Sequence, residues 1–152
     1  MSVRIGYYFN TNQPLHNFAE TVNGVLGCSL APHDGDHTDF YCRFLAMEFS
    51  LGHNYLNSNR DLNTHDFGYI LEARIPSSDN ELLTIATQTM MSVAYVLHVR
   101  LNIHFGTLVW DAQTVLAKYE LRDCEFNEPE WYDSVSGKFV RDHTHWLDVL
   151  ER

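Results

Sequence analysis

The chain has 152 residues, 45% of them hydrophobic and 13% aromatic, so it fits one folded domain and is excluded from the intrinsically disordered class. Twenty acidic residues against ten basic ones give a formal net charge of −10, which disfavours nucleic acid and anionic membranes and favours a basic partner. The charge alone is equally typical of a cytosolic protein that must stay soluble. We expect a single domain over residues 1–152.

The three cysteines, Cys28, Cys42 and Cys124, are widely spaced and include no C-x-x-C pair. Their odd number and spacing predict neither a disulfide framework nor a zinc knuckle, and favour a reducing compartment. The N-terminus lacks the layout of a signal peptide, and no apolar run approaches the roughly 20 residues of a membrane span. We expect a cytoplasmic protein.

A strand and a helix are predicted at the N-terminus. The odd-numbered residues from Val3 to Phe9 are apolar and alternate with Arg4, Gly6 and Tyr8, which is the period of a strand. Pro14 favours a helix start, an apolar stripe follows from residue 15 to 26, and Gly27 is a plausible stop. Residues 31–39 carry turn formers without an apolar period and predict an exposed loop.

The next segment predicts a small antiparallel meander. Residues 40–55 are too long for one ordinary strand, so we divide them near Leu45-Ala46 into two paired strands. A polar loop over residues 57–66 leads to a third strand over residues 68–75.

The longest apolar stripe lies between Ser78 and Asn102 and predicts the helix around which the domain is organised. Ser78-Asp79-Asn80-Glu81 fits a capping box, in which the serine and glutamate side chains bond free backbone N–H groups. His98 is interpreted as a satisfied histidine near the end of this helix. Apolar residues recur at steps of three and four along it, at Leu82, Ala86, Met90, Val93, Leu97 and Leu101.

The remaining elements complete the predicted fold. Residues 107–110 predict a strand, residues 115–121 an element of uncertain type, residues 132–140 a hairpin and residues 146–152 a helical turn. This order is that of an α+β, ferredoxin-like or split β-α-β sandwich, in which two helices cover one face of an antiparallel sheet and a C-terminal hairpin extends it. An aromatic sheet face left exposed would be a natural binding surface.

The best candidate for binding is the acidic and aromatic segment over residues 120–133, which carries six acids and one base. Carboxylates steer a basic partner, and tyrosine and tryptophan supply rigid contact area. Equally, Trp131 fits a packing role in the domain. The nominated binding residues are Asp111, Asp123, Glu125, Glu128, Glu130, Trp131, Tyr132 and Asp133.

An alternative is a small metal-dependent enzyme whose site is the exposed loop predicted over residues 31–39. Two imidazoles and three carboxylates within seven residues could hold a divalent ion, although a solvated loop is the interpretation we favour. No nucleophile elbow or phosphate cradle is present, so we nominate no catalytic residue and expect no cofactor. The alternative ligands are His33, Asp34, Asp36 and His37, completed by His143 or His145.

Residues 44–51 with the Asn-rich loop after them, the long second helix, and the segment LVWDAQTVLAKY at residues 108–119 resemble small bacterial immunity-type α/β proteins over residues 1–121. The resemblance implies a non-catalytic cytoplasmic protein that neutralises a toxin by occluding its active surface. That family has no fixed contact motif, so the resemblance implies no contact residues.

Overall fold

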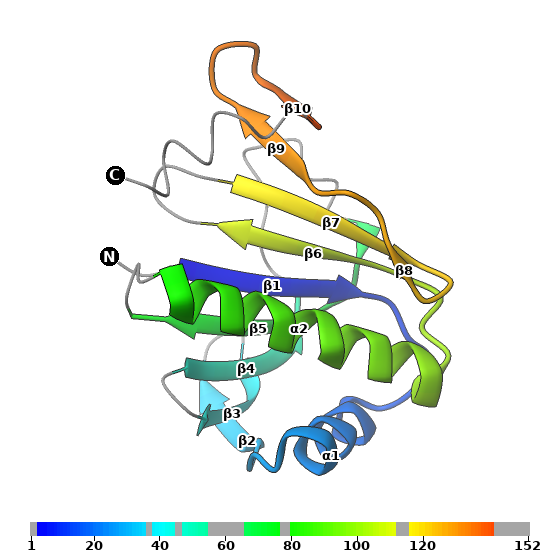
Figure 1. The fold of residues 1–152 in the computed structure, drawn as a ribbon. Helices are drawn as coiled ribbons and strands as arrows, with labels where there is room; N and C mark the ends of the chain where they lie inside the picture. The colour runs from blue at the N-terminus through cyan, green and yellow to red at the C-terminus, as the bar shows by residue number, and fades with distance from the viewer. Residues whose placement is uncertain are drawn as a thin grey trace.

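The computed structural model describes residues 3–35, 38–44, 47–54, 66–76, 80–111 and 116–141. These residues form two helices and one ten-stranded antiparallel sheet (Figure 1). In chain order the elements are β1 (Val3–Phe9), α1 (Leu15–Leu26), β2 (Ala31–Gly35), β3 (Thr38–Phe44), β4 (Met47–His53), β5 (Tyr69–Ile75), α2 (Asn80–Leu101), β6 (Phe105–Asp111), β7 (Leu116–Arg122), β8 (Glu125–Phe126), β9 (Glu130–Asp133) and β10 (Lys138–Val140).

The α+β class is as expected, but the sheet is larger than the predicted sandwich. Its strands lie in the order β10-β9-β7-β6-β1-β5-β4-β3-β2, with β8 paired to β7. The first strand of the chain therefore lies in the interior of the sheet, between β5 and β6. The burial of β1 does not alternate as the sequence period suggested, because Gly6 and Tyr8 are buried as well and only Arg4 of this strand is exposed.

The predicted meander is confirmed, and its division falls at the expected place. β3 ends at Phe44, β4 begins at Met47, and the register pairs these two residues. β5 then pairs with β4. The exposed loop expected over residues 31–39 is wrong in part, because residues 31–35 form the edge strand β2 and β3 already begins at Thr38. Pairing with β3 outweighs the turn propensity of these residues.

Both helices lie on one face of the sheet (Figure 1). α2 packs against β1, β5 and β6, whereas α1 packs against α2 and β4. α1 begins at Leu15, one residue later than expected, because Pro14 keeps an extended ψ of 143°. Gly27 ends it with a left-handed φ of 67°, as predicted, and donates its N–H to the Asn23 carbonyl at 2.8 Å.

α2 is confirmed as the helix that covers the sheet. Ala86, Met90 and Leu97 of its predicted stripe are buried, whereas the capping serine Ser78 lies outside the described residues. By length and composition, residues 81–101 are apolar enough to cross a membrane, at a mean hydropathy of 1.4. We expected no segment apolar enough to span a membrane, because the sequence has no continuous apolar run of that length, so this mean hydropathy is higher than expected. Part of this apolar content is buried, as at Met90 and Leu97, whereas Ile85, Tyr95 and Val99 are exposed on α2.

The two faces of the sheet differ in character. Beneath the helices lies the main core, which includes Tyr7, Phe9, Phe18 and Phe49. The other face, here called the helix-free face, carries the even-numbered residues of β1 and a smaller buried cluster. That cluster consists of Tyr8, Phe67, Ile70, Val109 and Leu116, with Tyr132 and Phe139 packed against it.

The C-terminal third adds strands to the sheet. The element of uncertain type is the strand β7, and β9 and β10 form the predicted hairpin, in which Gly137 has a positive φ of 69°. The N–H of Gly137 donates to the Asp133 carbonyl at 2.8 Å. The predicted loop over residues 57–66 lies, except for Asp66, outside the described residues, as does the predicted helical turn over residues 146–152.

Candidate functional site

Three of the nominated carboxylates are exposed where the chain leaves β7. Asp123 lies in the two-residue turn between β7 and β8, Glu125 begins β8, and Glu128 follows it. The side chains of Glu125 and Glu128 make no hydrogen bond or ion pair to a described residue, and the Asp123 carboxylate has only His104, whose Nδ1 is 3.8 Å from its Oδ1. We call Asp123, Glu125 and Glu128 the acidic turn.

An exposed aromatic ring lies beside the acidic turn. Phe105, at the start of β6, is 36% exposed and pairs in register with Arg122, which directly precedes Asp123. The guanidinium of Arg122 lies over the Phe105 ring, 5.1 Å from its centroid, so this base contacts an aromatic face. The combination of carboxylates and an aromatic side chain is thus present, with Phe105 as an aromatic residue that the sequence pattern did not nominate.

Asp111 does not join this group. It ends β6, whereas Phe105 beside the acidic turn begins the same strand. At the rise of a strand, the two ends lie about 20 Å apart. Asp111 is exposed but interacts with another part of the chain. The structure therefore separates it from the acidic turn.

The other nominated residues have structural roles in the hairpin. Trp131 is 5% exposed and meets Trp110 edge to face at 5.9 Å between centroids, which is the packing role given as its alternative. Glu130 forms an ion pair with Lys118 at 3.1 Å. Tyr132 packs against Phe139 at 5.5 Å between centroids.

Asp133 supports the turn of that hairpin. Its Oδ1 accepts the backbone N–H of Val135 at 3.0 Å, and its carbonyl accepts the N–H of Gly137. Such an Asx turn fixes the backbone and uses the carboxylate locally. The nominated set therefore separates into an exposed acidic turn, a distant Asp111 and a structural hairpin.

The alternative metal site is described only in part. His33 and Asp34 lie exposed on β2, where the His33 ring contacts that of Tyr41 at 5.2 Å between centroids. Asp36, His37, His143 and His145 lie outside the described residues. Within the described ranges, no group of three histidine, cysteine or acidic side chains is arranged to hold a metal ion.

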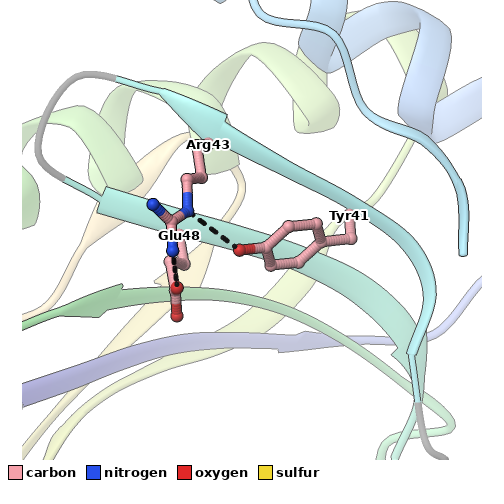
Figure 2. Close-up of polar contacts among 3 residues, drawn as sticks. All are labelled: Tyr41, Arg43 and Glu48. Atoms are coloured by element: carbon pink, nitrogen blue, oxygen red, sulfur yellow. Dashed lines mark hydrogen bonds and ion pairs between the residues drawn. The ribbon is translucent and has the colours of Figure 1, made fainter. Parts of the chain in front are cut away.

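A second group of charged side chains lies on the helix-free face, and the sequence pattern did not single it out. Arg43, Glu48, Arg74, Arg4 and Asp111 follow one another in register across five strands. Arg43 donates to the Tyr41 hydroxyl at 3.5 Å and to Glu48 at 3.4 Å (Figure 2). These residues are brought together by the pairing of the five strands. The only sequence signal that they share a face is the alternation of side chains along β1 and β5.

No protein-family model matches the sequence, and no curated protein or solved structure matches it either. Function is therefore inferred from the residues and their geometry.

Proposed function

We propose that this protein is a non-catalytic, immunity-type binding protein of a bacterial cytoplasm that neutralises a basic toxin or effector. The observation that carries the proposal is the acidic turn, in which the side chains of Glu125 and Glu128 are exposed and make no hydrogen bond or ion pair to a described residue. A surface held ready for a basic partner keeps its carboxylates free in this way. The net charge of −10 adds long-range attraction for such a partner.

Phe105 supplies the apolar part of the proposed contact. Aromatic side chains near the centre of an interface carry much of its affinity, while charges at its rim raise the association rate. Trp131 is not part of this surface, because its ring is buried against Trp110. The contact would thus consist of Phe105 and the acidic turn beside it.

The proposal is tested by charge reversal. The purified protein is used to capture its partner from lysate of the source organism, and the double variant Glu125→Lys/Glu128→Lys is compared with Glu20→Lys/Asp34→Lys. All four positions are exposed, so the two variants change the net charge equally. We expect the first variant to lose a basic partner that the second retains, and the wild-type interaction to weaken with salt.

Equal retention, or equal loss, in both variants would contradict the proposed surface. A partner that is captured but whose toxic activity is not inhibited by the wild-type protein would contradict neutralisation. Phe105→Ala tests the apolar contact separately, because it leaves every charge in place. Its expected effect is faster dissociation with little change in the association rate.

For the fold, we further propose that β1, α1, β4, β5, α2 and β6 form a ferredoxin-like unit to which the other strands were added. The spatial order β6-β1-β5-β4 of its strands supports this, since each chain segment β1-α1-β4 and β5-α2-β6 then spans one intervening strand. Superposition of these six elements on ferredoxin-like domains tests the proposal.

A further inference from the structure

Two arginines lie directly opposite each other on the helix-free face. Arg4 of β1 and Arg74 of β5 are register partners, and both are exposed. Like charges placed opposite on neighbouring strands destabilise a sheet. A chain with only ten basic residues thus places two of them where they repel each other.

Neither guanidinium makes a hydrogen bond or ion pair to a described residue, although Asp111 of β6 is the register partner of Arg4 and the charges of both arginines lower the pKa of Glu72. Arg43 in the same row, by contrast, is held by Tyr41 and Glu48 (Figure 2). Glu48, the register partner of Arg74, is occupied by Arg43. Ten donor N–H groups of two guanidiniums therefore remain on one small area of surface.

Tyr8 brings a hydroxyl to the same place. The Tyr8 ring lies along Gly6, because a Cβ at Gly6 would come within 3.1 Å of Tyr8 Cε2. Burial raises the pKa of the Tyr8 hydroxyl, the charges of Glu72 and Asp111 raise it further, and Arg4 lowers it, which places the hydroxyl near the end of β1 that carries Arg4. A hydroxyl donor thus lies on the Arg4 side of the two guanidiniums.

We propose that Arg4, Arg74 and the Tyr8 hydroxyl form a binding site for an oxyanion, either a carboxylate or a phosphate group. The planar fork of a guanidinium matches both groups with two parallel hydrogen bonds. An anion between the two arginines would also remove their mutual repulsion. The proposal is independent of the acidic turn, which lies at the opposite end of these strands.

Glu72 lies beside the proposed site, and its carboxylate affects anion binding there. It lies next to Arg74 on the same face, is half-buried, and makes no hydrogen bond or ion pair to a described residue. Burial raises the pKa of this carboxyl, and Arg4 and Arg74 act in the opposite direction. When ionised, Glu72 repels an incoming anion, so it opposes binding at this site.

The test measures binding of inorganic phosphate and of succinate by calorimetric titration in a zwitterionic buffer, with the full chain. We expect saturable binding of at least one, weakened at least about tenfold by Arg74→Gln, because charge-assisted hydrogen bonds are lost. The control Arg100→Gln removes the same charge from an exposed position on α2 and should change affinity less than about threefold. The preferred probe identifies the ligand group.

Three results would overturn the site: no saturable binding of either anion, equal losses in Arg74→Gln and Arg100→Gln, or an unchanged affinity in Arg74→Gln. A melting curve checks that each variant is folded. If Arg74→Gln unfolds, Arg74→Lys takes its place, because it retains the charge but lacks the fork. A lysine that binds as well as the arginine would then contradict the proposed geometry.

Discussion

The ring and hydroxyl of Tyr7 lie over Gly106 on the neighbouring strand, and a Cβ at position 106 would overlap them. Gly106→Ala should therefore lower the free energy of unfolding by about 1–3 kcal/mol, the usual cost of overpacking a core. The control is Gly24→Ala in α1, where no atom lies within 4 Å of the added methyl group. Urea denaturation should show Gly24→Ala to be more stable than wild type by about 0.5–1 kcal/mol. A stable Gly106→Ala protein would contradict the tight contact.

Tyr7 itself gives the second prediction. Its hydroxyl is buried and bonds no described residue, so it loses its water without compensation. Tyr7→Phe keeps the ring and removes this unsatisfied group, and it should raise the free energy of unfolding by about 1 kcal/mol. Chemical denaturation of both proteins measures the difference. A loss of stability would show that the hydroxyl has a partner.

Glu72 makes stability depend on pH. Its folded-state pKa is raised by burial, so the stability that comes from its protonated form is complete below the unfolded pKa, near 4.5, and is lost as pH rises through the folded pKa. Glu72→Gln should therefore match wild type in acid and exceed it at neutral pH. The groups that face Glu72 are Arg4 and Tyr8 of β1, Arg74 of β5, Glu48 and Ser50 of β4, and Asp111 of β6.

Thermal melts at a series of pH values measure that difference. A constant gap between the two proteins at every pH would rule out titration of Glu72 as its cause. If the oxyanion site is also present, the stabilised variant keeps its anion binding. Glu72 would then lower the stability of the folded protein at neutral pH without being needed for anion binding.

Thiol labelling should distinguish the three cysteines. Burial, and then the neighbouring Cys42, raises the pKa of the Cys28 thiol to about 11, whereas Cys124 is exposed in the β7–β8 turn. At pH 8 only about one Cys28 in a thousand is a thiolate, the reactive form. We expect one fast-reacting thiol per native chain, identified by peptide mapping as Cys124, and three after denaturation. A second fast thiol in the native protein would disprove this.

Local patterns in the sequence predicted most elements correctly. The boundary between β3 and β4 falls between Phe44 and Met47, as predicted, and Gly27 ends α1, because both depend on residues close in the chain. The strand β2 was missed because its pairing with β3 outweighs its turn-forming composition.

The sites depend on relationships that the sequence does not carry. Two roles were open for Trp131, and only its burial against Trp110 separates packing from surface contact. Arg4 and Arg74 are distant in the chain, and the register of β1 with β5 alone makes them neighbours. The carboxylates of the acidic turn were nominated from the sequence, because acidic residues are concentrated in that segment. Phe105 was not, because only its pairing with Arg122 brings it beside the acidic turn.

The interior position of β1 also affects how the chain folds during synthesis. β1 precedes β2 to β10 in the chain and is synthesised before them, yet its two neighbours are β5 and β6, and β6 ends at Asp111. One edge of this apolar strand can pair with β5, but its other edge stays unpaired until β6 has been synthesised. Such distant pairing slows folding and leaves the nascent chain open to aggregation. We expect truncated chains that end before β6 to require chaperones, although they contain α1 and the whole meander.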